Sequence, residues 1–264
     1  IMSKKLAEGI DALVLDVKTG NGAFMQTYDD ALALATVLVG IGNAMGKKTV
    51  GFITDMSQPL GCMVGNWLEV VESVECLRGK NVPDLMGVTY VLGGAMLWLG
   101  GKAESIADGM KQCKAAIYSG KAYEKFLQVV ARQGGDVSFV EDPRKYPSAK
   151  HVVEVASTAG GYVTGFDTMQ IGLLGVELGA GRKKVDDVID PAAGIVLKKK
   201  IGDKVEPKET IATLFSNNAD SLKEASERLR SFIHFGKSTV SSPPLIRAYV
   251  DAEGARPWNT PALY

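Results

Sequence analysis

Residues 11–24 read DALVLDVKTGNGAF, and this stretch decides the fold class. Its first half, Leu13 to Val17, is a short apolar run with β-branched residues, which is typical of a buried strand. Gly20 and Gly22 then predict a tight loop. A helical pattern begins at Tyr28 and continues to about Ala44. A strand, a glycine loop and a helix in this order indicate an open α/β sheet, whose ligands bind at the carboxyl ends of strands.

The rest of the chain first continues this pattern of strands and helices and then changes to short β-type runs. A second strand is predicted over residues 48–53 and is followed by a loop at residues 54–61. Further helices are predicted over residues 64–77, 84–99, 105–119 and 122–133. Short β-type runs follow at residues 151–155, 161–165, 195–205 and 209–215. Residues 219–235 then predict one amphipathic helix. We therefore expect an α/β fold with a mixed sheet flanked by helices, and a small C-terminal α+β module.

Composition narrows the class of protein. Thirty basic and thirty acidic residues balance, so no nucleic-acid or membrane surface is expected. No apolar run approaches the roughly 18 residues of a membrane span, and no signal peptide is predicted. Cys62, Cys76 and Cys113 are too few for a disulfide framework or zinc site and indicate buried thiols in a reducing cytoplasm. His151 and His234 lie outside glycine-flanked loops at strand ends, which argues against Ser-His-Asp chemistry.

Several segments, in order, resemble the pyrimidine-nucleoside phosphorylases and thymidine phosphorylases. They are SKKLAEG at 3–9, LDVKTGNGAF at 15–24, TDMSQPLG at 54–61, VGN at 64–66 with LEV at 68–70, and LGAGR at 178–182. The resemblance runs from Ile1 to about Val250. It implies a pentosyltransferase that converts a pyrimidine nucleoside (thymidine, uridine or deoxyuridine) and phosphate into the free base and a pentose 1-phosphate. It also implies a cytoplasmic homodimer without an organic cofactor.

Composition along the chain and the resemblance together imply a division of the chain. The expected parts are the end of a small helical domain (1–10), the α/β glycosyltransferase domain (11–141), a connection (142–150), the C-terminal α+β module (151–250) and a poorly ordered tail (251–264). The family's phosphate-binding segment and its pyrimidine-binding arginine have no counterpart here. We therefore expect a C-terminal fragment that folds but is inactive alone.

Lys4 matches the family lysine that binds the pyrimidine carbonyl. The chemistry asks for a cation there, because negative charge builds on the departing base as the glycosidic bond breaks. Lys4 and Lys5 lie about 100° apart on a helix, so at most one can face a cleft. The alternative interpretation is an ordinary solvated lysine pair.

Phe24 matches the aromatic residue beside the base pocket. Its ring could stack on a pyrimidine and exclude water, or it could close the strand–loop corner as a core residue. Asp16 and Lys18 share one face of the predicted strand and are expected to pair with each other. We assign them no catalytic role.

Leu60, Met63 and Glu72 fall where the bacterial pyrimidine-nucleoside type binds a monovalent cation, K+ in our interpretation. The first two would offer backbone carbonyls and the third a carboxylate, which are oxygen ligands suited to a hard cation. The alternative for Glu72 is an exposed helix carboxylate.

Two other interpretations compete with the enzyme. A chain without the phosphate site could be a noncatalytic binding or interaction module derived from the same family. The run GDKV at residues 202–205 resembles the turn of biotinyl and lipoyl carrier modules, but no displayed lysine tip follows it. A structural role for that turn is expected.

Overall fold

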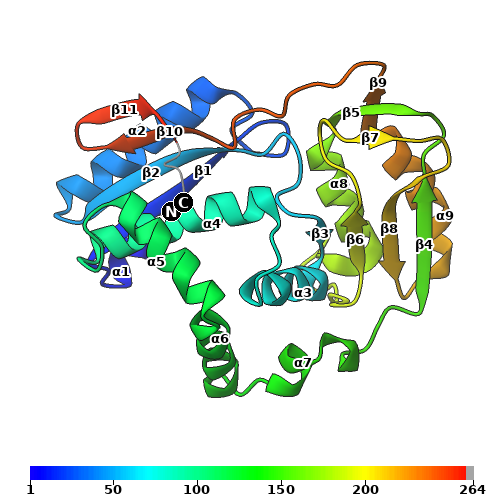
Figure 1. Ribbon diagram of the computed structural model, residues 1–264, viewed down its shortest axis with the longest axis horizontal. Coiled ribbons are helices and arrows are strands. Elements are labelled where there is room, and N and C mark those ends of the chain that lie inside the picture. The colour runs from blue at the N-terminus through cyan, green and yellow to red at the C-terminus, as the bar shows by residue number, and fades with distance from the viewer. Residues whose placement is uncertain (260–264) are drawn as a thin grey trace. The chain divides into compact units, whose positions relative to one another are not determined.

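The structure, a computed structural model, describes residues 1–259 and falls into two compact units (Figure 1). Among the described residues, unit 1 consists of 1–56, 83–119 and 243–259, and unit 2 of 57–82 and 120–242. Unit 1 has one sheet and two hydrophobic clusters, and unit 2 has two sheets and one large hydrophobic core.

Unit 1 is built on a mixed four-stranded sheet. Strand β1 (Ala12–Thr19) lies parallel to β2 (Lys48–Asp55). Strand β10 (Ile246–Asp251) runs antiparallel to β2 and to β11 (Gly254–Pro257), so the order is β1-β2-β10-β11. The predicted mixed sheet is confirmed.

Helices cover both faces of this sheet, and β2 contributes to a hydrophobic core on each face because its neighbouring residues point to opposite sides. Ile53 packs with α2 (Tyr28–Ala44) through Ala31, Ala35 and Val39, whereas Phe52 packs on the other core with α4 (Pro83–Leu99) and α5 (Ile106–Tyr118). Helix α2 begins where Thr27 Oγ1 accepts a hydrogen bond from the Asp30 N–H at 3.2 Å, a side-chain N-cap. The short helix α1 (Met2–Ala7) precedes the sheet.

Unit 2 holds two antiparallel sheets around one large core. The first has the order β3 (Met63–Val64), β6 (Gly194–Leu197), β8 (Thr210–Ser216), β4 (His151–Ala156), and the second has the order β7 (Lys204–Val205), β5 (Gly161–Phe166), β9 (Ile233–Gly236). Its α-helices are α3 (Asn66–Leu77), α6 (Lys121–Arg132), α7 (Val137–Glu141), α8 (Thr168–Gly175) and α9 (Ala219–Ser231). A short 3-10 helix, η1 (Pro143–Lys145), and a short π-helical segment, η2 (Val176–Ala180), accompany them. The core gathers Phe166, Ile195, Ile211 and Leu229 with their neighbours.

Three predicted elements were wrong in extent. The run 195–205 is two strands, β6 and β7, because residues 200–203 form a turn closed by the Asp203 N–H on the Lys200 carbonyl at 3.0 Å. The helix predicted to 235 ends at Ser231, since Ile233 and Phe235 pair with β5 instead. The tail expected to lack order forms β11 against β10, and residues 260–264 lie outside the described residues.

The predicted domain boundaries at residues 10, 141, 150 and 250 stay a prediction. Each compact unit is built from segments that are distant in sequence, so the units do not test boundaries between consecutive segments. Within residues 1–259, no helix is long and apolar enough to cross a membrane.

Candidate functional site

The carboxyl ends of β1 and β2 carry a compact charged group. Lys18 Nζ lies 2.5 Å from Asp16 Oδ2 and donates to Thr54 Oγ1 at 3.0 Å. Thr54 in turn donates to Asp16 Oδ1 at 2.5 Å. The parallel register places Lys18 directly opposite Thr54, which explains why the three groups meet. The expected pairing of Asp16 with Lys18 is confirmed.

The loops that follow these two strands are joined to each other. The Met56 N–H donates to the Thr19 carbonyl at 2.6 Å, and the Gly22 N–H donates to the Met56 carbonyl at 3.0 Å. Gly20 has φ 113°, a backbone conformation that favours glycine. This loop presents Phe24, whose side chain is 96% exposed, so its interpretation as a core residue was wrong.

Lys4 and its neighbour behave differently on α1. Lys5 Nζ pairs with Glu8 Oε2 at 3.0 Å, one helical turn away. Lys4 is exposed, and within residues 1–259 no side-chain partner is found for its ammonium group. Lys4 is therefore the lysine of the pair that is available to a ligand.

Glu72 is a buried carboxylate that closes a loop of unit 2. Its side chain belongs to α3 and the residue is only 3% exposed, so the exposed-carboxylate interpretation was wrong. Glu72 Oε1 accepts from the Cys62 N–H at 2.9 Å and Oε2 from the Met63 N–H at 3.3 Å. We call residues 58–63 the Glu72 loop.

Gly61 is the residue that lets the loop approach this carboxylate. A Cβ at Gly61 would lie 2.3 Å from Glu72 Oε2, and its φ of 70° is left-handed. Only glycine satisfies both conditions. The sequence signal for this close approach is the Pro59–Leu60–Gly61 turn itself.

The carbonyl that the resemblance assigned to Met63 lies on the same side of the strand as Glu72. The Leu197 N–H donates to the Cys62 carbonyl at 2.7 Å, so the next pair, Met63 and Val196, is a non-hydrogen-bonded pair of the antiparallel ladder. Both backbone groups of Met63 therefore face away from β6, and its N–H meets Glu72 there. For the Leu60 carbonyl, no hydrogen bond is found within residues 1–259.

The structure thus brings Met63 and Glu72 into direct contact, with Leu60 on the same loop. Carbonyl and carboxylate oxygens suit an alkali cation, so this donor set fits one. Within the described residues, no group of three or more His, Cys, Asp and Glu side chains could hold a metal. A cation here would depend on backbone oxygens.

Two further carbonyls of the Glu72 loop are held by Lys200, a residue to which the sequence analysis assigned no role. Its ammonium group donates to the carbonyls of Pro59 and Gly61. The run of three lysines at 198–200 gave no sign of which one would reach the loop.

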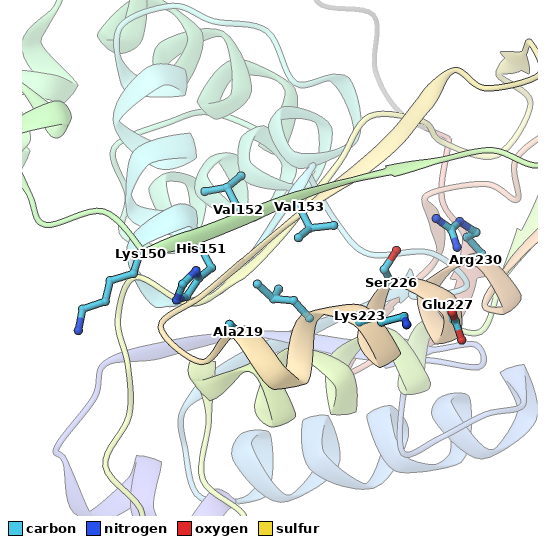
Figure 2. Close-up of a pocket in the computed structure, with 10 residues that line it drawn as sticks. Lys150, His151, Val152, Val153, Ala219, Lys223, Ser226, Glu227 and Arg230 are labelled. Carbon is cyan, nitrogen blue, oxygen red and sulfur yellow. The ribbon is translucent and has the colours of Figure 1, made fainter.

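A separate cavity of about 570 Å³ lies between β4 and α9 (Figure 2). Lys223, Ser226 and Arg230 line its helical wall, and Val152 and Val153 line the strand. None of the five predicted site residues borders it, so it forms no part of the candidate site.

Comparison with known proteins covers most of the chain. Residues 1–123 match the family model for the a/b domain of a glycosyl transferase family, and residues 162–236 match the model for the pyrimidine nucleoside phosphorylase C-terminal domain. A pyrimidine-nucleoside phosphorylase of Geobacillus stearothermophilus is 43% identical over 93% of this chain. That of Staphylococcus aureus is 44% identical over 95%.

These relatives are longer than the chain. It spans 57% of the length of either one. The two family models and the more than two-fifths identity over nearly the whole chain point to the same group of proteins. Over 93–95% of its length, the chain is thus similar to the pyrimidine-nucleoside phosphorylases.

Proposed function

We propose that the full-length protein catalyses phosphorolysis of pyrimidine nucleosides, with thymidine, uridine and deoxyuridine as substrates beside phosphate. The observation that carries the proposal is Lys4, a lysine at the family's pyrimidine-binding position whose side chain is exposed and has no partner within residues 1–259. Two relatives named pyrimidine-nucleoside phosphorylase support the same reaction. The activity is proposed for the full-length protein because the chain spans 57% of those relatives.

Lys4 would act on the base. When the glycosidic bond breaks, its electron pair stays with the pyrimidine, and negative charge spreads to the ring carbonyls. An ammonium group that donates to such a carbonyl binds this charge more strongly in the transition state than in the substrate, which raises the rate of the chemical step. A phosphate oxygen forms a bond to the sugar carbon that the base leaves, and the second product is a pentose 1-phosphate.

Phe24 would act beside the base. An aromatic ring with 96% of its surface exposed has nothing to pack on in unit 1, and a flat pyrimidine is a suitable contact. Such a ring would exclude water from the base and so strengthen the Lys4 interaction.

The matched pair Lys4→Ala and Lys5→Ala tests the assignment in the full-length protein. Lys4→Ala should lower kcat/KM for uridine and thymidine by about 10²–10³-fold, the usual effect of losing one donor to a developing anion. Lys5→Ala removes a lysine that is already paired with Glu8 and should leave turnover near wild type. Equal rates for the two variants would remove Lys4 from the site.

The Glu72 loop is proposed to contribute to a monovalent cation site for K+. The carbonyls of Leu60 and Met63 and the carboxylate of Glu72 would hold the ion. Two observations support this assignment. Glu72 accepts a hydrogen bond from the Met63 N–H, and the Met63 carbonyl faces away from β6 on the same side of the strand. The ion would supply positive charge that fixes the loop, and no chemical step is assigned to it.

We also propose that the full-length protein is a homodimer in the cytoplasm. The resemblance to the pyrimidine-nucleoside phosphorylases implies both the dimer and the location. Light scattering of the purified full-length protein would test the dimer.

A further inference from the structure

Strand β4 is a free edge of its sheet. Among residues 1–259 it pairs with β8 alone, at the end of the order β3-β6-β8-β4. An edge strand presents a row of backbone N–H and C=O groups with which another extended segment can pair. The register of the neighbouring strands shows which residues of β4 present these groups.

The backbone of β8 alternates between its two neighbours. The Ile211 carbonyl accepts a hydrogen bond of 2.8 Å from the residue that follows β6, so Ile211 faces β6 and the next residue, Ala212, faces β4. Ala212 lies opposite Val155, whose backbone groups therefore point to β8. The N–H and C=O groups of Val152 and Glu154 consequently point away from the sheet. Within residues 1–259, no hydrogen bond is found for these outward groups.

Helix α9 borders the same edge. The Ser157 N–H donates to the Glu209 carbonyl at 2.8 Å on the β8 side, so the preceding residue, Ala156, faces outward. Arg230 Nε, from α9, donates to the Ala156 carbonyl at 3.0 Å. The helix is thus attached to one end of the free edge, and the edge groups of Val152 and Glu154 lie beyond that attachment.

The cavity of about 570 Å³ between β4 and α9 includes this edge (Figure 2). Val152 and Val153 both line it although neighbouring side chains of a strand point to opposite faces, so the cavity reaches around the backbone of the strand. On the helical wall, Ser226 is only 6% exposed, and no hydrogen bond is found for its hydroxyl within residues 1–259. Buried hydroxyls normally have a partner, so Ser226 is left for an occupant of this groove.

The charges around the groove favour an acidic occupant. Lys150, Lys223 and Arg230 line it beside a single carboxylate, that of Glu227. Within residues 1–259, neither lysine forms an ion pair. A second copy of the same edge would bring like charges together, whereas an acidic segment would neutralise them.

We propose that the groove between β4 and α9 binds an extended acidic peptide segment of a partner protein, which adds to the sheet as a further strand beside β4. The segment would exchange backbone hydrogen bonds with Val152 and Glu154, the groups that give affinity in strand addition. Every second side chain of the segment would face α9, where Lys223 and Ser226 lie. None of the five predicted site residues borders the groove, so this binding would be independent of the proposed phosphorolysis.

Fluorescence anisotropy of the 264-residue chain with a defined probe tests this. The probe is a fluorescein-labelled, end-capped heptapeptide that alternates valine and glutamate. One control peptide has lysine in place of each glutamate, which reverses its charge. The other keeps the glutamates but carries a methyl group on every backbone nitrogen, which removes the N–H donors that strand addition needs.

Two variants of the chain test the two sides of the groove. Val152→Pro removes an outward N–H and leaves the hydrogen bonds to β8 in place, and Val152→Thr is its matched control because it keeps that N–H. Lys223→Glu reverses a charge on the helical wall. Lys237→Glu is its matched control, because Lys237 is an exposed lysine of the same unit that does not line the groove. The Tm of each variant verifies that it is folded.

The valine–glutamate peptide should bind the wild type, and Val152→Pro and Lys223→Glu should each raise its Kd about tenfold or more. Both control variants should bind it as the wild type does. Equal affinity for the lysine peptide or the methylated peptide would overturn the proposal, and so would a Kd that neither variant changes or no binding up to about 1 mM. If Val152→Pro does not fold, the methylated peptide and the wild type still decide whether backbone pairing is needed. Association of the chain with itself that Val152→Pro abolishes would assign the edge to a second copy instead.

Discussion

The two units hold their predicted site residues in opposite ways. In unit 1, Lys4 and Phe24 are exposed, and Phe24 is exposed over 96% of its surface. In unit 2, Glu72 is 3% exposed and bonded to two backbone N–H groups. The first two residues contribute nothing visible to folding and are suited to a ligand, whereas Glu72 is part of the fold. Substitutions in unit 1 should therefore cost activity, and those around Glu72 should cost stability.

The largest loss of stability is expected for Glu72→Ala. It leaves the N–H groups of Cys62 and Met63 without their acceptor in a buried site, which should cost about 2–4 kcal/mol. Glu75→Ala is the matched control on the same helix, because Glu75 forms a half-exposed pair with Lys80 and should cost at most about 1 kcal/mol. Urea unfolding measures both, and equal losses would contradict a structural role for Glu72.

Gly65→Ala should have the next largest effect. Gly65 has φ 138°, and a Cβ there would lie 2.4 Å from the Ala193 carbonyl oxygen, so α3 and β6 would have to separate. A loss of about 1–3 kcal/mol is expected. Gly172→Ala, where nothing lies within 4 Å in a regular helix, should be neutral or stabilising. A Gly65→Ala chain as stable as Gly172→Ala would show that the backbone can move there.

Alkaline pH should weaken both units, unit 2 through Cys76 and unit 1 through Tyr249 and through Cys113, whose pKa burial also raises. Burial, with a smaller contribution from Glu72, raises the pKa of Cys76 from 9.0 to about 11. Burial, with Asp251, raises the pKa of Tyr249 from 10.0 to about 12. Both groups are neutral in the folded state, so their contribution to stability is complete below the unfolded pKa and is lost as pH rises through the folded one. The Cys76 contribution is thus lost between about pH 9 and 11, and that of Tyr249 between about pH 10 and 12.

Urea midpoints measured from pH 8 upward check this decline in stability. Cys76→Ala should remove the part of the decline that begins near pH 9, on the order of 2 kcal/mol at most. A decline of the same size in Cys76→Ala and wild type would assign it to other groups.

The smallest effect on stability is expected for Lys4→Ala and Phe24→Ala. Both side chains are exposed, and surface substitutions without a structural role change the free energy of unfolding by about 0.5 kcal/mol or less. Urea unfolding of the 264-residue chain measures this change in the free energy of unfolding. A larger loss for Phe24→Ala would mean that its ring packs in solution and would weaken the base-stacking role.

Periodicity predicted most elements because local rules agree with the fold there. The strand from Leu13, the helix from Tyr28 and the helix ending near Leu99 lie close to their predicted bounds. The helix predicted to 235 was wrong because Ile233 and Phe235 gain more from pairing with β5 than from continuing α9, and helical spacing alone cannot register a distant strand.

The candidate site was predictable only in part. The resemblance assigned roles to Lys4, Leu60, Met63 and Glu72, and those roles stay predictions. Nothing in the sequence showed that Glu72 is buried or that Lys5, not Lys4, is paired. Lys200 was missed because its contacts with Gly61 span 139 residues, a separation that no local pattern encodes.

The most direct test of the central claim is release of free base by the full-length protein from uridine and thymidine, with and without phosphate. We predict that base appears only when phosphate is present, with one pentose 1-phosphate formed for each base, and that Lys4→Ala slows both products equally. Base released at the same rate without phosphate would indicate hydrolysis, and no release under either condition would favour a noncatalytic module; each result would contradict the proposed function.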